Sequence, residues 1–239
     1  MRFLLHLIIA SLLCIVTVQA ARILMLAPVC SKSHRHGFMP IMEALAKRGH
    51  QVTVITPYSS KQAIPNLTEI TIQSAFDVTD FDWFGMTLMS PFQAVVKILG
   101  QFTTLNEKGY HRLMENKDFQ NLLATRDVDL VIVDAILNDF TMPIVDTMKV
   151  PFMFYCPAAA VPWLADYMNM PQEYSYVPAG QGDYGTDMTF FQRLGNMLSS
   201  EIFLAIRKWF VLPAIDEITQ KDFPNARPIA EIERDAQIA

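Results

Sequence analysis

The sequence predicts an α/β fold with a mostly parallel sheet and helices on both of its faces. Of its 239 residues, 51% are hydrophobic, which is ample for the packed core of one large domain. Short β-branched runs alternate with longer amphipathic segments between residues 22 and 155. Such alternation is typical of parallel strands joined by crossover helices.

The first strand, helix and second strand have clear sequence patterns. Ile23–Ala27 is an apolar run of strand length, and Val52–Thr56 is a β-branched run that stops at a proline. The segment between them has the spacing of a helix lying on a sheet, with Pro40 in its first turn and Gly49 at its end. Its apolar stripe consists of Phe38, Ile41, Met42, Leu45 and Ala46.

The remaining elements follow from the same two periodicities. Alternating isoleucines and threonines predict a third strand, and two apolar runs predict a fourth and a fifth. A longer helix is expected from Thr189 to Leu212, ended by Pro213. The other predicted elements are a strand at 68–72, a helix in the second half of 81–102, a helix at 105–123, a strand at 130–133, a helix within 140–148 and a strand at 152–155.

The N-terminus has the pattern of a secretory signal. A charged start precedes the apolar stretch Phe3–Val18, and Val18-Gln19-Ala20 is a small-residue cleavage site. We expect residues 1–20 to be a signal peptide, with a retained membrane anchor as the alternative. The protein would then enter the secretory pathway, where the sequon at Asn66 is a candidate glycosylation site.

Charge and cysteine content bear on partners and on redox state. The net charge of -5 is not the basic charge typical of nucleic-acid-binding proteins, so nucleic acid is not an expected partner. Cys30 and Cys156 both follow predicted strands, and an oxidising compartment would permit a bridge between them. Two cysteines do not make a disulfide scaffold, so we expect two half-buried thiols.

Two polar residues stand where central strands are expected to end. His34 is expected in the loop after the first strand, and Asp134 ends the fourth. Open parallel sheets bind ligands at the carboxyl ends of their strands, so both side chains should face one crevice. A histidine and an aspartate there predict general-base chemistry, with His34 as the base. The structural alternatives are a loop histidine bonded to backbone and an aspartate that caps a helix or turn.

The loop after the first strand lacks the motifs of several other enzyme classes. Residues 28–36 contain no glycine, which excludes the glycine-rich loops that bind dinucleotides and nucleoside triphosphates. No Gly-x-Ser-x-Gly motif occurs, which argues against an α/β-hydrolase. Cys30, His34 and His36 could bind zinc together with Asp134, but histidines separated by one residue on a loop need not converge. We expect no metal.

Three ordered blocks carry a family resemblance. One runs from Ser33 through residues 45–55, and a second spans residues 128–150 and contains a strand-terminal aspartate. The third contains residues 176–178 and 187–190 with Arg193 and Asn196. These blocks cover most of the chain from Arg22 to Asn196, and they resemble the UDP-glycosyltransferases of animal membranes, the UDP-glucuronosyltransferase and UDP-glucosyltransferase family.

The resemblance implies a Rossmann-like domain that forms the N-terminal half of a GT-B glycosyltransferase. In that family the N-terminal half binds the acceptor, and the C-terminal half binds most of the UDP-sugar. The family's catalytic histidine falls on His34, and the aspartate that orients it falls on Asp134, whereas residues 35–37 depart from the family pattern. The donor-domain signatures and the C-terminal anchor do not occur in this sequence, so we expect residues 21–239 to be the acceptor domain of a truncated chain.

The same resemblance implies the substrates and the compartment. A UDP-sugar would be the co-substrate, with no other cofactor, and a small lipophilic hydroxyl compound would be the acceptor. The full-length protein would act in the endoplasmic reticulum lumen in association with the membrane, and homo-oligomerisation stays open. Methionine and aromatic side chains adapt to varied apolar ligands, although most of them are expected in the core. The expected acceptor-binding residues are Ser33, Phe84, Met89, Tyr155 and Trp163.

A function of another class stays as the alternative. The chain could be a non-catalytic luminal module that binds small apolar ligands, or a regulatory partner of a full-length transferase. In either case we expect the polypeptide alone to transfer little or no sugar from a UDP-sugar. The sequence identifies neither the donor sugar nor the acceptor.

Overall fold

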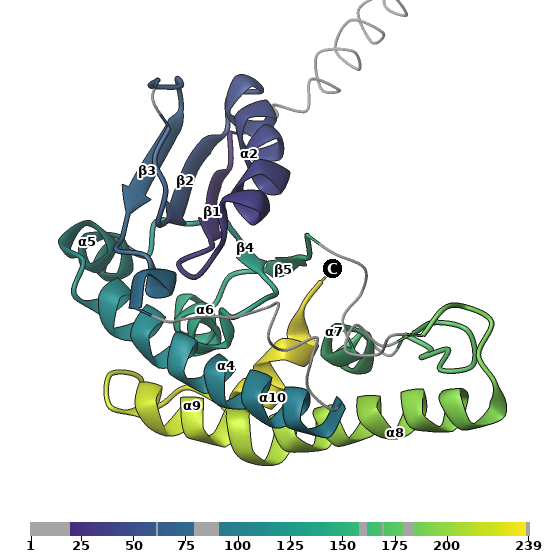
Figure 1. Cartoon of the computed structure of the whole chain (residues 1–239). Coiled ribbons are helices and arrows are strands. Elements are labelled where there is room, and N and C mark those ends of the chain that lie inside the picture. The colour runs from purple at the N-terminus through teal and green to yellow at the C-terminus, as the bar shows by residue number, and fades with distance from the viewer. Residues whose placement is uncertain are drawn as a thin grey trace, which may run out of the picture.

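Five parallel strands form the centre of the molecule (Figure 1). The computed structural model describes residues 20–60, 62–78, 91–157, 162–168, 170–178 and 184–237. Within them the strand order is β3-β2-β1-β4-β5, and all four neighbouring pairs are parallel. The strands are β1 (Arg22–Leu26), β2 (Gln51–Thr56), β3 (Leu67–Thr71), β4 (Leu130–Asp134) and β5 (Phe152–Tyr155). The predicted sheet is confirmed, with every strand end within one residue of its expected position.

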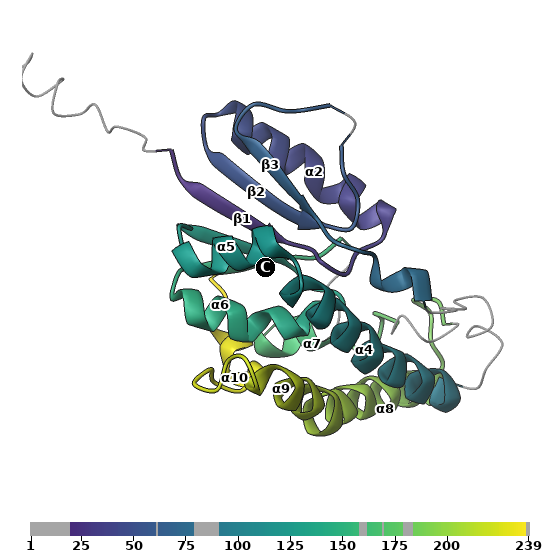
Figure 2. The same cartoon turned by 90° about the vertical axis from the view of Figure 1, so that its left-hand side faces the viewer.

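Helices cover both faces of the sheet. They are α2 (Lys32–Lys47), η1 (Ala75–Val78), α4 (Pro91–Met114), α5 (Lys117–Thr125), η2 (Asp139–Thr141), α6 (Met142–Met148), α7 (Pro162–Tyr167), α8 (Phe190–Ile206), the π-helical turn η3 (Arg207–Val211), α9 (Leu212–Gln220), α10 (Ile229–Ile232) and η4 (Glu233–Asp235). Helix α2 lies on one face, α4, α5 and α6 lie on the other, and α8 and α9 form a layer beyond α4 (Figure 2). The expected two-sided arrangement is therefore confirmed.

Side chains of β1 alternate between the two faces and enter two different cores. Leu24 and Leu26 join the larger core, which continues into α4, α8, α9 and α10. Ile23, Met25 and Ala27 join the smaller core under α2. The alternation follows from the two-residue repeat of a strand. The sheet is thus buried on both sides, as parallel sheets require.

Helix α2 begins at Lys32, six residues before Phe38, the first residue of the apolar stripe that predicted the helix. Ser31 caps the helix, because its hydroxyl accepts a 3.3 Å hydrogen bond from the backbone N–H of His34. The loop position expected for His34 is therefore wrong, and His34 lies in the first helical turn. Pro40 stands inside the helix on its exposed side, where the interrupted backbone bond can reach water.

Two other helix boundaries differ from the sequence prediction. The helix expected at 105–123 is divided between α4 and α5, because the side chain of Asn116 caps α5 by accepting from the N–H of Phe119 at 3.0 Å. Pro213 does not end the long C-terminal helix. The π-helical turn before it widens the backbone, and Pro213 occupies the first turn of α9, where a missing N–H is tolerated.

Some expectations fall on parts of the chain that the structure does not describe. These are the signal segment at residues 1–19 and the residues Phe84 and Met89. In the parts that are described, no helix is long and apolar enough to span a bilayer.

Candidate active site

The candidate site lies where the strand order reverses direction. From β1 the chain crosses to β2 and β3 on one side, whereas β4 and β5 lie on the other side of β1. The loops that leave neighbouring β1 and β4 therefore diverge and leave a crevice at the carboxyl ends of the strands. His34 follows β1, and Asp134 is the last residue of β4.

The structure brings His34 and Asp134 into direct contact. Nδ1 of His34 lies 2.9 Å from Oδ2 of Asp134. The side chain of Asp134 is fully buried, and that of His34 is 22% exposed. The second carboxylate oxygen accepts a 3.1 Å hydrogen bond from the N–H of Ile136. Burial raises the pKa of Asp134, whereas the hydrogen bond and charge of His34 and the N–H of Ile136 oppose that rise.

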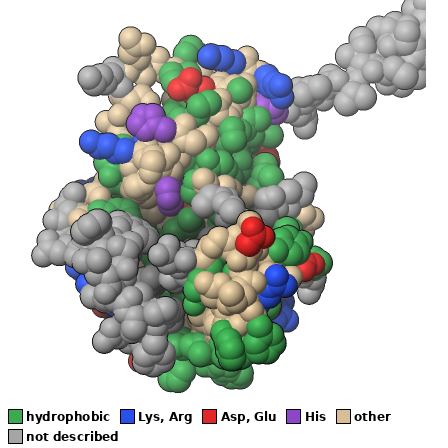
Figure 3. All heavy atoms as spheres, turned by 45° about the vertical axis from the view of Figure 1, so that its right-hand side comes forward, with side chains coloured by type: hydrophobic (Ala, Val, Ile, Leu, Met, Phe, Trp, Pro, Cys, Tyr) green, Lys and Arg blue, Asp and Glu red, His purple; other side chains and the backbone are tan. Residues whose placement is uncertain are grey.

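This contact determines which ring nitrogen of His34 is available. Carboxylate oxygens only accept hydrogen bonds, so Nδ1 carries the ring proton and donates a hydrogen bond to Asp134. Nε2 then keeps its lone pair, and it has no hydrogen bond to any described side chain or backbone group. Histidine side chains reach the surface of the part of the molecule formed by the sheet and α2 (Figure 3). A partly exposed imidazole with a free Nε2 can remove a proton from a bound hydroxyl.

Arg35 fixes the N-terminal turn of α2 against the far strands of the sheet. Its Nε donates to the carbonyl of Tyr58 at 3.1 Å, and its Nη2 lies 2.6 Å from Glu69 and 2.7 Å from the hydroxyl of Ser60. Arg35 and Glu69 are both mostly buried. The departure from the family pattern at residues 35–37 therefore includes a structural anchor for the helix that carries His34.

Tyr155 lies beside the pair. It is the β-sheet partner of Asp134, and its ring packs edge-on against Phe38 with centroids 5.9 Å apart. Its hydroxyl lies against Gly37, where a β-carbon would overlap it. Burial, and then the charge of Asp134, raise the pKa of Tyr155, so the phenol stays protonated at neutral pH. Tyr155 can therefore donate a hydrogen bond in this crevice, and it cannot act as a base there.

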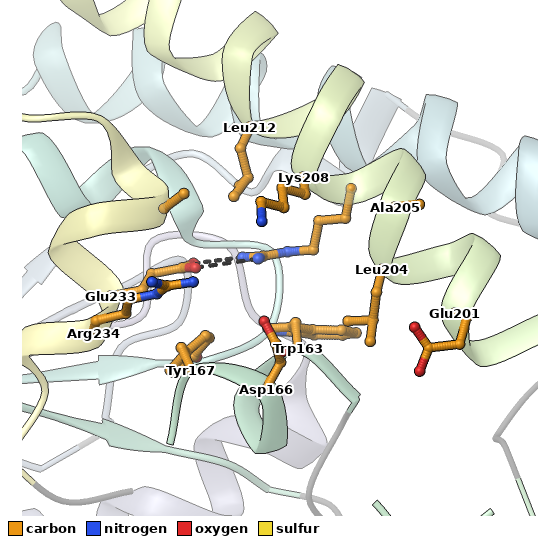
Figure 4. A pocket seen from close by; sticks show the side chains of 12 residues that line it. Trp163, Asp166, Tyr167, Glu201, Leu204, Ala205, Lys208, Leu212, Glu233 and Arg234 are labelled. Atoms are coloured by element: carbon orange, nitrogen blue, oxygen red, sulfur yellow. Dashed lines mark hydrogen bonds and ion pairs between the residues drawn. The ribbon is translucent and has the colours of Figure 1, made fainter. Parts of the chain in front are cut away.

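The other expected acceptor-binding residues lie in different surroundings. Ser33 is exposed one position before His34, and its hydroxyl lies 2.7 Å from that of Ser31. Trp163 is buried in the larger core, stacked on Phe203 at 5.5 Å, and its indole N–H donates to the carbonyl of Ala135 at 3.4 Å. Trp163 also lines a pocket of about 220 Å³ between α7, α8 and η4 (Figure 4). No role in acceptor binding follows from these positions alone.

Cys30 and His36 form hydrogen bonds with groups outside the His34–Asp134 pair. Cys30 is buried with its Sγ 3.4 Å from the hydroxyl of Thr56, and burial raises its pKa to about 12. The ring Nδ1 of His36 donates to the carbonyl of Lys32 at 2.6 Å. Cys30 and Cys156 are not joined by a disulfide. Among the described residues, no group of three His, Cys, Asp or Glu side chains is placed to hold a metal ion, and the absence of a metal stays a prediction.

Asn66 lies at the opposite end of the sheet, directly before β3. Its backbone is left-handed, with φ of 62°, a conformation that asparagine tolerates better than most residues. The side-chain amide donates to the carbonyl of Ala46 at 3.3 Å and accepts from Gln51 at 3.2 Å. A glycan on this exposed residue would be far from the crevice, and glycosylation there stays a prediction.

Sequence reasoning missed one buried side chain at the site. Asn138 lies four residues after Asp134 and hydrogen-bonds the loops that follow both β1 and β4. An asparagine shortly after a strand-terminal aspartate is a weak signal, because turns favour the same residue for local reasons. Only the packing of the two loops distinguishes Asn138 from an ordinary turn residue.

The third sequence block forms a local framework rather than part of the crevice. Thr189 and Gln192 make a capping box at the start of α8. Arg193 donates to the carbonyl of Met188 at 2.9 Å. The side chain of Asn196 donates to the carbonyls of Tyr174 and Val177, both at 2.8 Å. These bonds tie the loop at residues 174–177 to α8.

Comparisons with known proteins agree with this arrangement. The family model of UDP-glucuronosyl and UDP-glucosyl transferases matches residues 21–223. The chain is similar to UDP-glycosyltransferase UGT5 of Dactylopius coccus, with 31% identity over 207 residues, which cover 84% of this chain and 39% of that protein. It is 27% identical to UDP-glucuronosyltransferase 2B7 of Rattus norvegicus over 74% of this chain and 36% of that protein.

A human relative gives the same picture. UDP-glucuronosyltransferase 1A1 of Homo sapiens is 25% identical over 80% of this chain and 38% of its own length. The chain thus spans less than half the length of each of these curated relatives. The family model covers most of the chain, including both members of the His34–Asp134 pair. The chain therefore belongs to the UDP-glucuronosyl and UDP-glucosyl transferase family.

Proposed function

We propose that this chain supplies the acceptor-binding half and the catalytic base of an inverting glycosyl transfer. The donor is a UDP-sugar carrying a hexosyl or glucuronosyl group, and the acceptor is the hydroxyl of a small lipophilic molecule. The observation that carries the proposal is the 2.9 Å contact between His34 and the buried Asp134 at the switch point of the sheet. Membership of the family supports UDP-sugar transfer in general.

In the proposed reaction, Nε2 of His34 takes the proton of the acceptor hydroxyl. The acceptor oxygen forms a bond to the anomeric carbon of the sugar as the bond from that carbon to the UDP oxygen breaks, with inversion. Asp134 holds Nδ1–H and stabilises the imidazolium that forms, the role that the buried aspartate has in a serine-protease triad. General-base assistance of this kind is typically worth about 10² to 10⁴ in rate.

The proposal assigns donor binding to the part of the relatives that this chain does not match. The match covers 39% of UGT5, so we assign the groups that bind UDP to the part of such relatives that the match does not cover, and we expect these 239 residues alone to be inactive. No cofactor besides the UDP-sugar is invoked. The acceptor domain is taken as residues 21–239. The apolar N-terminal pattern supports delivery to the endoplasmic reticulum lumen, and membrane association is proposed for the full-length protein.

A chimera tests the proposal. Residues 21–239 of this chain replace the corresponding N-terminal segment of UDP-glycosyltransferase UGT5, and transfer is measured from UDP-glucose and UDP-glucuronic acid to a panel of phenols. His34→Ala should lower kcat by about 10² or more, and Asp134→Asn should lower it severely as well, because both changes remove proton transfer without removing the acceptor site. His36→Ala is the matched control, since this exposed ring bonds only within its own helix.

The outcomes separate the two classes of function. The base assignment is supported if the parent chimera transfers sugar, His34→Ala abolishes this transfer, and His36→Ala leaves it intact. Near-normal rates after His34→Ala remove it. A folded chimera that binds phenols and transfers nothing favours the non-catalytic binding module instead.

A further inference from the structure

Asn138 occupies the point where the loops from β1 and β4 separate. It lies in the loop between β4 and η2 and is 2% exposed. At a switch point the chain leaves neighbouring strands toward opposite faces, so the ladder that pairs the strands cannot hold the loops together. The base follows one of these loops, and its carboxylate begins the other.

The amide of Asn138 bonds to backbone groups on both sides of this gap. Its Oδ1 accepts from the N–H of Val29 at 2.8 Å, and its Nδ2 donates to the carbonyl of Val29 at 3.0 Å. The same Nδ2 lies 3.2 Å from the carbonyl of Asp134 and 2.7 Å from that of Ile136. An N–H only donates and a carbonyl only accepts, so these partners fix which way the amide points.

Asn138 is itself held firmly. Its backbone carbonyl accepts from the N–H of Thr141 at 3.0 Å and from the hydroxyl of the same residue at 2.7 Å. The preceding residue, Leu137, has a left-handed backbone with φ of 65° and is buried. A leucine in that conformation is strained and persists only where its surroundings over-determine it. The hydrogen bonds of Asn138 and Thr141 hold Leu137 in this conformation.

We propose that Asn138 is a positioning residue for the His34–Asp134 pair. It holds the backbone of Val29, two residues before the Ser31 cap that starts α2, and the backbone of Asp134 in one rigid unit. The separation between the imidazole and the carboxylate is thereby fixed across the gap between the two loops. The inference deepens the proposed function and rests on it, since positioning matters only if His34 is the base.

The amide is suited to this task because it carries no charge. It contacts four backbone groups beside a buried carboxylate, with its two N–H groups shared among three carbonyls, without adding a second titrating group to the crevice. A misplacement of about 1 Å in a catalytic pair can lower a rate about 10²-fold, so loss of the bridge should act on turnover. Substrate binding, which uses other groups, should change little.

The test compares two variants with a matched control. Asn138→Ala removes all four contacts, and Asn138→Ser keeps a hydroxyl for the nearby loop carbonyls while losing the reach to Val29, so it serves if the alanine variant does not fold. Asn106→Ala is the control. Asn106 is another fully buried amide, which bonds Phe102, Asp139 and Phe140 and neither Val29 nor Asp134.

The first readout is the ring proton of His34 on Nδ1, observed by NMR in the chain itself and assigned with His34→Ala. We expect this downfield resonance to be lost or shifted in the Asn138 variants and unchanged in Asn106→Ala. The comparison is made between variants that lose a similar amount of thermal stability. An unchanged resonance in a folded Asn138 variant, or an equal change in Asn106→Ala, overturns the proposal. This readout needs no substrate, so it stays decisive even if sugar transfer is disproved.

The second readout uses the UGT5 chimera. Asn138→Ser should lower kcat about tenfold or more with KM within about threefold, whereas Asn106→Ala should leave both near the parent values. A rise in KM at constant kcat would assign Asn138 to binding and contradict the positioning role.

Discussion

The buried carboxylate of Asp134 is the residue on which the site depends. Taking a charge out of water is unfavourable unless it is paired and hydrogen-bonded, and burial accordingly raises the pKa of Asp134. Two groups compensate it: the Nδ1–H of His34 and the N–H of Ile136. In the proposed reaction His34 gains a proton, and the new positive charge meets a negative charge that was poorly solvated beforehand. The pair therefore favours the imidazolium at the step where it forms.

The titratable side chains next to Asp134 other than His34 are unsuited to accept a proton. Burial raises the pKa of Cys30 to about 12, and the charge of Asp134 adds to that rise. Burial and the same charge raise the pKa of Tyr155. Both groups stay protonated at neutral pH, whereas histidine is the side chain that most often serves as a general base. Among the described groups beside Asp134, the histidine is the one suited to act as a base.

At the scale of elements, helix α4 packs unusually close to the loop after β1. The close approach occurs at Gly109, where a β-carbon would overlap the side chain of Val29 and lie 2.9 Å from the ring of Phe140. Val29 is the residue whose backbone Asn138 holds. The loop that leads to His34 is thus enclosed by α4 on one side and by the β4 loop on the other.

Gly109→Ala should therefore destabilise the chain by about 1 to 3 kcal/mol, because a methyl group has no room between α4 and Val29. The control is Gly100→Ala on the same helix, where nothing lies within 4 Å of the added carbon. That change should stabilise by up to about 1 kcal/mol through helix propensity. Urea unfolding of both variants measures the difference, and equal effects at the two positions would refute the close packing.

At the scale of the whole molecule, a buried ionic cluster joins three distant segments. Arg207 in η3 contacts Asp139 in η2 and Glu233 in η4, each at 2.5 Å, and all three side chains are at most 6% exposed. Figure 4 shows the contact with Glu233 at one side of the pocket lined by Trp163 and Tyr167. Gln237, which lies beyond the family match, also bonds the sheet, since its N–H donates to the carbonyl of Phe152 at 3.0 Å.

Arg207→Leu should unfold more easily than the parent by about 3 to 5 kcal/mol at pH 7, because it leaves two carboxylates buried without their cation. Burial already raises the pKa of Glu233, and Arg207 opposes that rise. A carboxyl with a raised pKa contributes most stability below its unfolded value and loses that contribution as pH rises through its folded value. The deficit of the variant should therefore shrink in acid.

Urea unfolding of parent and variant at pH 7 and in mild acid measures this deficit. Lys208→Leu is the control, since its exposed ammonium lies over the ring of Trp209, and it should change stability by no more than about 0.5 kcal/mol. A deficit for Arg207→Leu that is the same at both pH values would contradict the buried-charge explanation.

The parts of this molecule that sequence reasoning predicted are those set by periodic patterns. Strands rich in β-branched residues, such as Val52–Thr56, could be located to within a residue, and the crevice followed from where two strands end. The start of α2 was missed because one serine hydroxyl at Ser31 determines it. Asn138 was missed because its importance lies in contacts with Val29, 109 positions away, which no local pattern encodes.

The ring tautomer of His34 tests the central claim most directly. Long-range ¹H–¹⁵N spectra of the chain at about pH 9, where free imidazole is neutral, report which nitrogen carries the proton. The account predicts the Nδ1–H form in the parent chain and a loss of that preference in Asp134→Asn. A proton on Nε2 in the parent, or a tautomer that Asp134→Asn leaves unchanged, would contradict the account, because Nε2 could not then accept a proton from an acceptor hydroxyl.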